Sequence, residues 1–251
     1  PQPNNNSSLI TNSVKSTDRS VNPEVENSLS RDPVLVDIGQ VEKPRHTSLI
    51  DASTNGAELK GIHDEAEFAC LYYYNSVYIG GSATSGSAGS WAYDRPLLAW
   101  ATSAALRNNL FFNARTGGTG KHYAMGNEVG AQNWTTTSSD YNVYVSSNLN
   151  TIATWESADQ TMQLWRDSSD GDKHTWSTSS TTLSAANLFI DIPGCNLKIN
   201  TSSYEAWLVS GKGLAIAGQT TDYEGTSRPT TIAAGCSDIG CDELAAVPPN
   251  N

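Results

Sequence analysis

The chain has 251 residues, a net charge of −11 and an isoelectric point near 4.7. An acidic surface repels phosphate backbones and anionic lipid, which argues against nucleic-acid binding and against docking on membranes. No run of eighteen apolar residues occurs, which excludes a transmembrane helix. With 16% charged residues and abundant Ser, Thr, Asn and Gly, the composition is typical of an all-β extracellular protein.

Residues 1–60 are predicted to form an extended N-terminal arm. Residues 1–32 are polar and too poor in apolar side chains to offset the entropy of ordering them. One strand is expected at residues 34–41, because apolar side chains alternate there between two flanking prolines. Its apolar members are Val34, Leu35, Val36, Ile38 and Val41.

A short repeat organises the rest of the chain. An asparagine precedes a brief apolar strand four times, at Asn75, Asn109, Asn142 and Asn187. The first two steps are about 34 and 33 residues long and the third is longer, and a near-constant period of this size indicates stacked repeats that bury their strands against one another. The pattern predicts a parallel β-solenoid over residues 61–245, with the asparagine amides bonded in a ladder. A β-sandwich with chance spacing is the alternative.

Several further elements are expected along the solenoid. Residues 91–93 read as a second strand of one coil, and residues 97–106 as a strand or a short helix. Mixed periodicity favours a short helix within residues 151–165, followed by an acidic turn at 167–172. Late strands are expected at 197–199 and 206–209, and residues 246–251 form a C-terminal tail.

Five segments of this sequence occur in the order known from one protein family. They are residues 71–81, 106–113, 117–124, 222–229 and 238–243. Together, over about residues 68–245, they resemble secreted bacterial surface proteins with right-handed parallel β-helix repeats of the pectate-lyase-like type. Glu224 and Cys241 stand where that family usually has Asp and Ala, and the stretch after Asn187 lacks its intervening proline. The resemblance implies a right-handed β-helix and a surface location, and no shared catalytic residues.

The four cysteines permit two disulfides in a secreted protein. They are Cys70, Cys195, Cys236 and Cys241, which allow three pairings that the sequence does not distinguish. Spacing makes Cys195 with Cys236 or Cys241 attractive, whereas Cys70 is equally suited to be a small buried apolar residue.

Two acidic groups are candidate cation sites. Four carboxylates near the C-terminal end, Asp222, Glu224, Asp238 and Asp242, are a candidate calcium site, although such residues more often cap turns through their own backbone. The run from Asp167 to Asp172 lacks the residue order of an EF-hand loop and is better read as a solvated turn. We therefore expect no cofactor, with calcium as the one candidate.

Catalysis is not expected from this pattern. Parallel β-helices often carry polysaccharide lyases and hydrolases, and a glycosidase needs two carboxyl groups facing each other across a groove. The candidate acids are Asp94, Glu128, Asp140, Glu156 and Asp159, and they do not recur at one register on adjacent coils. The seven tryptophans are expected in the core or an interface rather than on a sugar-stacking face.

The open ends of a solenoid and the apolar strand in the arm predict a structural role. Exposed strand edges invite a further strand, so the segment 34–41 is expected to insert into a neighbouring subunit and build an extracellular, head-to-tail homo-oligomeric filament. The chain begins with Pro1, which we interpret as the start of a processed, secreted chain. The alternative is a carbohydrate-binding or polysaccharide-degrading module of a larger surface protein, whose mark would be two exposed aromatic residues on adjacent coils beside a carboxylate pair. An adhesin stalk fragment is a third interpretation.

Overall fold

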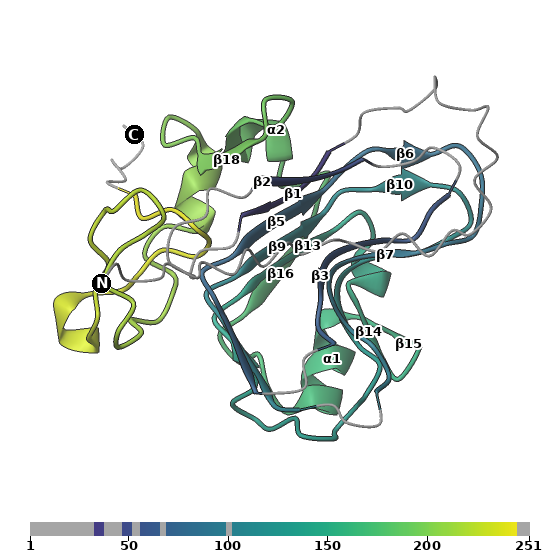
Figure 1. The fold of residues 1–251 in the computed structure, drawn as a ribbon, viewed down its shortest axis with the longest axis horizontal. Coiled ribbons are helices and arrows are strands. Elements are labelled where there is room, and N and C mark those ends of the chain that lie inside the picture. The colour runs from purple at the N-terminus through teal and green to yellow at the C-terminus, as the bar shows by residue number, and fades with distance from the viewer. Residues whose placement is uncertain (1–32, 38–46, 52–55, 66–68, 99–101, 245–251) are drawn as a thin grey trace, which may run out of the picture.

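The computed structural model describes residues 33–37, 47–51, 56–65, 69–98 and 102–244, and its central feature is a parallel β-solenoid (Figure 1). The first coil contains β3 (Leu59–His63), β4 (Cys70–Tyr73), β5 (Ser76–Ile79) and β6 (Ser82–Ala83). The second contains β7 (Ser90–Arg95), β8 (Ala104–Arg107), β9 (Leu110–Asn113) and β10 (Thr116–Gly117). The third contains β11 (His122–Asn127), β12 (Ser139–Asp140) and β13 (Val143–Ser146).

The last coil is interrupted by helices. It contains η1 (Leu149–Thr151), β14 (Ala153–Trp155), β15 (Ala158–Gln160), α1 (Met162–Ser169) and β16 (Trp176–Ser179). The helix expected within residues 151–165 therefore begins only at Met162. The residues before it form an antiparallel hairpin of β14 and β15, because Thr161 caps the helix by accepting from the Leu164 backbone N–H.

Three sheets run along the solenoid. The first has the order β16-β13-β9-β5-β1-β2, the second β15-β14-β11-β7-β3 and the third β12-β8-β4, and we call them sheets A, B and C. Strands from successive coils pair in parallel, with Val77 opposite Phe111 and Phe111 opposite Tyr144. This arrangement establishes the solenoid and excludes the β-sandwich.

The interior of the coils is filled by apolar and aromatic side chains. The Phe111 ring stacks on Tyr93 at 5.6 Å and on Tyr144 at 6.1 Å between ring centroids. At the end of the stack, Trp165 from α1 is fully buried and meets Trp134 and Trp155 edge to face. Edge-to-face and offset stacking are the favoured aromatic geometries, so α1 closes the interior with a tryptophan cluster.

The turn between sheets C and A has the same backbone conformation in three coils. Tyr74, Asn108 and Tyr141 have φ of 59°, 58° and 56°, which is the left-handed region. This conformation is uncommon for residues other than glycine. Each of these residues stands immediately before one of the repeat asparagines, so one tight turn recurs at the same place in successive coils.

The repeat asparagines form a hydrogen-bonded column. The Asn75 amide donates to the Asn109 Oδ1 at 2.8 Å, and the Asn109 amide donates to the Asn142 Oδ1 at 2.9 Å. The backbone N–H of Asn75 and that of Asn109 donate to the same oxygens at 3.0 and 2.9 Å. Because all three side chains are buried, each bond satisfies polar groups that water does not reach.

The sequence pattern placed Asn187 in this column, but the column does not continue to Asn187. Asn187 lies on the exposed side of α2 (Ala185–Leu188) and donates to Glu205. The fourth position belongs to Thr175, whose hydroxyl accepts from the Asn142 backbone N–H at 2.9 Å. The longer third step in the sequence reflects a chain that has already left the solenoid.

Asp172 lies at the last-coil end of the column and accepts hydrogen bonds there. Its side chain is buried and accepts from Ser139 at 2.9 Å and from the Trp165 indole at 2.7 Å. Thr175 also donates to it. Burial raises the pKa of Asp172, and these donors oppose that effect. The interpretation of residues 167–172 as a solvated turn is therefore wrong at Asp172, which belongs to the core.

The chain after β16 folds against the outer face of sheet A. It contains α2, β17 (Phe189–Asp191), β18 (Asn196–Ile199), η2 (Tyr204–Leu208) and η3 (Ile232–Ala234), and Figure 1 shows this part beside the sheet in green and yellow. The strand predicted at 197–199 is present, whereas residues 206–209 belong mostly to a 3₁₀ helix. A second buried apolar cluster joins Phe112 and Val145 of the sheet to Phe189, Val209 and Ile239.

The arm strand pairs with its own chain. β1 (Pro33–Asp37) runs antiparallel to β5, with Val34 opposite Ile79 and Val36 opposite Val77. β2 (Thr47–Asp51), which the sequence pattern did not indicate, pairs with the other side of β1. Ile38 and Val41 of the predicted strand lie outside the described residues. The edge of sheet A at the first coil is thus covered within the chain.

The asparagine column predicts a large loss of stability in Asn109→Ala. This change removes the Oδ1 that accepts from the Asn75 side-chain amide and backbone N–H. It also removes one of the two donors to the Asn142 Oδ1, whose bond from the backbone N–H of residue 109 remains. We expect a loss of about 3 kcal/mol in the free energy of unfolding, measured by urea denaturation. Asn187→Ala, at the exposed position, is the matched control and should change stability by less than about 0.5 kcal/mol. Equal effects of the two changes would refute the role of the column.

Candidate functional site

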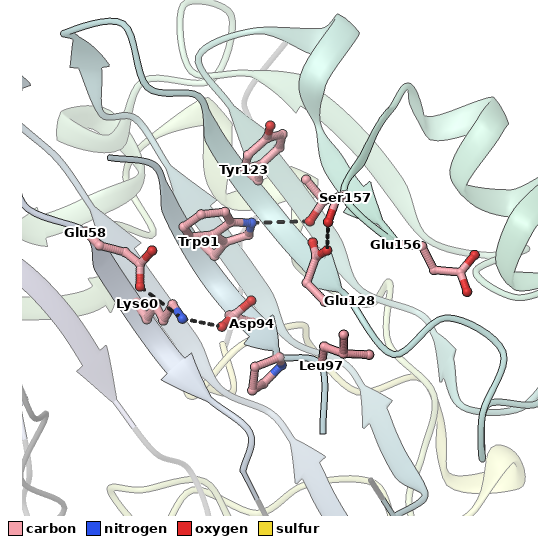
Figure 2. Close-up of a pocket in the computed structure, with 11 residues that line it drawn as sticks. Glu58, Lys60, Trp91, Asp94, Leu97, Tyr123, Glu128, Glu156 and Ser157 are labelled. Atoms are coloured by element: carbon pink, nitrogen blue, oxygen red, sulfur yellow. Dashed lines mark hydrogen bonds and ion pairs between the residues drawn. The ribbon is translucent and has the colours of Figure 1, made fainter. Parts of the chain in front are cut away.

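A groove on the outer face of sheet B is the candidate site (Figure 2). It has a volume of about 650 Å³ and crosses strands β3, β7, β11 and β14, which are neighbours in the sheet. Its walls are formed by Glu58, Lys60, Trp91, Asp94, Pro96, Leu97, Tyr123, Glu128, Thr154, Glu156 and Ser157. Concave surfaces with aromatic walls and a few polar groups are the usual form of small-molecule sites.

The floor of the groove is built from two rows of paired residues. In the first row Lys60 is opposite Trp91, and Trp91 is opposite Tyr123. In the second row Asp94 is opposite Gly126, and Gly126 is opposite Thr154. Parallel in-register stacking therefore places equivalent residues of successive coils side by side.

Trp91 is the central aromatic side chain. Its ring stacks on Tyr123 at 5.5 Å with an interplanar angle of 23°, and the Lys60 ammonium lies 5.7 Å from its centroid. The indole N–H crosses β11 and donates to the Thr154 hydroxyl at 3.3 Å. A Cβ at Gly126 would approach the indole to 2.7 Å, so glycine is required where the ring passes over the sheet.

Asp94 organises the charges at one end of the groove. Its Oδ2 is 2.9 Å from the Lys60 ammonium and 2.7 Å from His63 Nδ1, and its side chain is only 4% exposed. The hydrogen bond to Asp94 raises the pKa of His63, which burial and Lys60 oppose. Burial lowers the pKa of Lys60, but Asp94 and Glu58 outweigh it and the pKa is raised overall. Lys60 and Asp94 thus form a compensated ion pair, to which His63 is hydrogen-bonded.

A second charged pair lies beside Tyr123. The Tyr123 hydroxyl donates to Asp159 at 2.9 Å, and the Lys121 ammonium lies 2.5 Å from the same carboxylate. The hydrogen bond from Lys121 lowers the pKa of Asp159. Burial raises the pKa of Tyr123, and its bond to Asp159 adds to this, so the phenol stays protonated and fixed as a donor.

The far wall is a tight hairpin turn. Glu156 and Ser157 connect β14 to β15, and both have positive φ, 49° and 65°. Two-residue hairpins of this conformation normally carry Asn or Gly, and strained non-glycine residues tend to gather at functional sites. The turn brings the Ser157 hydroxyl to Glu128, to which it donates at 2.7 Å. A Cβ at Gly130 would meet the Glu156 carboxylate at 2.2 Å.

Four of the five acids considered from the sequence lie in or beside this groove. Glu128, Glu156 and Asp94 line it, and Asp159 contacts its Tyr123 wall. Asp140 lies elsewhere and accepts from His174 at 2.8 Å. As the sequence analysis noted, these acids share no register on adjacent coils; a bend after β11 and the hairpin of β14 and β15 bring Glu128 and Glu156 to the groove instead. The repeat spacing, applied to aromatic residues, would have indicated the pair of Trp91 and Tyr123.

Four of the six tryptophans that the structure describes lie in or against the two apolar cores, as expected from the sequence; Trp207 is partly buried, and Trp100 lies outside the described residues. Trp134, Trp155 and Trp165 are buried in the interior, and Trp176 packs on the second core. Trp91 is the exception, because it is half-buried on the outer face of a sheet and lines the groove.

The C-terminal carboxylates are used within the protein. Asp222 accepts from the backbone N–H groups of Glu224, Thr226 and Glu243. Glu224 forms an ion pair with Lys198 at 2.6 Å. Asp238 caps the Gly211 and Leu244 backbone, and Asp242 accepts from the Ile199 N–H. In the described part of the chain, no group of three or more His, Cys, Asp or Glu residues is arranged to hold a metal ion.

No disulfide joins the four cysteines. Cys241 is buried, Cys70 and Cys195 are half-buried, and Cys236 is exposed. All four lie within the described residues, so none of the three pairings considered from the sequence is formed in this structure.

Comparisons with protein-family models, with curated protein sequences and with solved structures find no match for this chain. The fold alone supports the resemblance of residues 68–245 to β-helix repeat proteins, and it does so only as far as the parallel β-solenoid. The handedness, the pectate-lyase-like type and secretion stay predictions. Of the helices that the structure describes, none is sufficiently long and apolar to cross a membrane.

The carboxylates near the C-terminal end predict a pH dependence of stability. Burial raises the pKa of Glu243 from 4.5 to about 7, despite its 2.7 Å ion pair with Arg228, and burial raises that of Asp242 from 3.8 to about 6. Between the ordinary and the raised pKa of each carboxyl, the folded state binds more protons than the unfolded state. Stability should therefore fall as pH rises through that window.

Glu243→Gln tests this expectation. Urea denaturation at a series of pH values should show a shallower decline of the unfolding free energy than in the unchanged protein. Asp170→Asn, at a carboxylate whose side chain is 73% exposed, is the control and should leave the slope intact. An unchanged slope in Glu243→Gln would show that this carboxyl does not carry the effect.

Proposed function

We propose that the chain is a carbohydrate-binding module that holds a glycan in the groove on sheet B. The observation that carries this proposal is the half-buried ring of Trp91, which stacks on the buried Tyr123 of the next coil and lies beside the carboxylates of Asp94 and Glu128. One ring is thus accessible, where the sequence analysis asked for two exposed aromatic residues. Aromatic rings offer apolar area with little conformational freedom to lose, and the neighbouring carboxylates and hydroxyls are ready acceptors for sugar hydroxyls.

We propose binding without cleavage. Glycoside hydrolysis requires a proton donor and a second carboxylate acting on opposite sides of the bond. Asp94 is committed to Lys60 and His63, and Asp159 to Lys121. These two carboxylates are therefore held by cations of the protein, and the half-buried ring of Trp91 favours holding a ligand. An extracellular or cell-surface location is part of the same proposal, because long glycans are encountered there.

The aromatic pair predicts the effect of Trp91→Ala. Affinity electrophoresis against a panel of neutral, amino and acidic polysaccharides should show retardation of the unchanged protein by at least one member. Titration calorimetry with the matching oligosaccharide should show binding weakened by at least about tenfold in Trp91→Ala, or about 1.4 kcal/mol.

Tyr204→Ala removes an aromatic side chain that is 73% exposed in a distant part of the fold, and it should bind as the unchanged protein does. Thermal denaturation of both variants separates lost binding from lost folding. Retention of full affinity in Trp91→Ala, or no retardation by any polysaccharide, would contradict the proposal.

A filament of strand-exchanged subunits is a second candidate function. It is favoured by β1, which lies outside the winding of the solenoid and pairs antiparallel with β5, whereas the solenoid strands of that sheet are parallel. In this structure the pairing is made within one chain. The same edge would accept β1 of a second copy, and repeated exchange of this kind produces an open, head-to-tail assembly.

Two truncations test the filament. Negative-stain microscopy should show fibres of the full chain and isolated particles after deletion of residues 1–42, which removes β1. Deletion of residues 1–30 retains β1 and should leave the fibres. The filament is ruled out if the full chain forms only isolated particles, or if the longer truncation still polymerises.

A further inference from the structure

The groove already holds one ammonium group of the protein itself. The Lys60 ammonium lies 3.1 Å from Glu58, 2.9 Å from Asp94 and 5.7 Å from the Trp91 centroid (Figure 2). Carboxylates and an aromatic ring are together a strong environment for a cation. At this end, the walls of the groove stabilise an ammonium group.

The opposite end also has two carboxylates, but no cation of the protein is paired with them in the described residues. Glu128 and Glu156 line it together with the hydroxyls of Thr154 and Ser157. Glu128 accepts from the Ser157 hydroxyl at 2.7 Å, and among the described residues neither glutamate forms an ion pair with a Lys, Arg or His. In Figure 2 the Trp91 indole N–H points toward this end and Lys60 lies at the other. Trp91 thus lies between Glu58 and Asp94, which are paired with Lys60, and the end lined by Glu128 and Glu156, which has no such cation.

The charge balance of the whole groove is negative. Its lining contains four carboxylates, those of Glu58, Asp94, Glu128 and Glu156, and one ammonium, that of Lys60. A concave surface concentrates such a field and attracts a ligand of the opposite sign. A uronic-acid polymer would place its carboxylates against uncompensated carboxylates and is disfavoured.

We infer that the groove takes a glycan that carries free amino groups, with a protonated amine of the sugar attracted to the end lined by Glu128 and Glu156 and the sugar ring against Trp91. The inference rests on the proposed glycan-binding function and specifies its substrate class. The aromatic pair serves any sugar of suitable shape, whereas the two glutamates distinguish an amine from its acetylated form. Binding by these charges is also expected to weaken as salt screens them.

The experiment compares three oligosaccharides of equal length by titration calorimetry, at a pH below the pKa of the sugar amine. They are a glucosamine oligomer, its fully N-acetylated counterpart and a galacturonate oligomer. We expect the glucosamine oligomer to bind at least about tenfold more tightly than the acetylated form, and this preference to shrink in high salt. The double variant Glu128→Gln, Glu156→Gln should lose the preference for the free amine over its acetylated form.

The double variant Asp167→Asn, Asp170→Asn makes the same change of charge at two exposed side chains, one in α1 and one at its C-terminal cap. It is the control, in which the preference should persist. Equal affinity for free and acetylated oligomers, or tighter binding of the galacturonate oligomer, overturns the inference while glycan binding stands. A preference that survives in the glutamate variant also overturns it. Binding of none of the three, together with none in the polysaccharide panel, defeats the proposed function itself.

Discussion

The hydrogen-bonded column of Asn75, Asn109 and Asn142 is the constraint on which the rest of the structure depends. Each asparagine follows a left-handed residue, so the chain turns at the same place in every coil and presents its amide to the next. A buried amide without its partners is costly, which makes slippage of one coil against another unfavourable. The register of sheets A, B and C follows from this one column.

The groove is a consequence of that register. Once the coils are locked, Trp91 and Tyr123 fall side by side, and Gly126 leaves space for the indole to cross to Thr154. The hairpin at Glu156 then adds carboxylates that no repeat would place there. A regular scaffold therefore supplies the aromatic floor, and an irregular turn supplies the wall, as is common where loops carry function on a rigid frame.

The two ends of the solenoid are closed in different ways. At the last coil, Trp165 and Asp172 bring a helix and a buried carboxylate under the column. At the first coil, β1 covers the edge of β5 with an antiparallel strand. A sheet edge left open invites further strands, so the same physical need explains the cap in this structure and the exchange of strands proposed between copies.

The residue pattern was sufficient to predict a parallel β-solenoid and the positions of Asn75, Asn109 and Asn142, because each coil contacts its neighbours at a constant spacing along the chain. It misplaced Asn187, since a period does not show where the chain leaves the stack. The burial of Asp172, the pairing of β1 with β5 and the lining of one groove by Glu128, Glu156 and Trp91 arise from tertiary structure. They depend on turns, caps and contacts between segments with no common period, and such contacts leave no regular trace in the order of the residues.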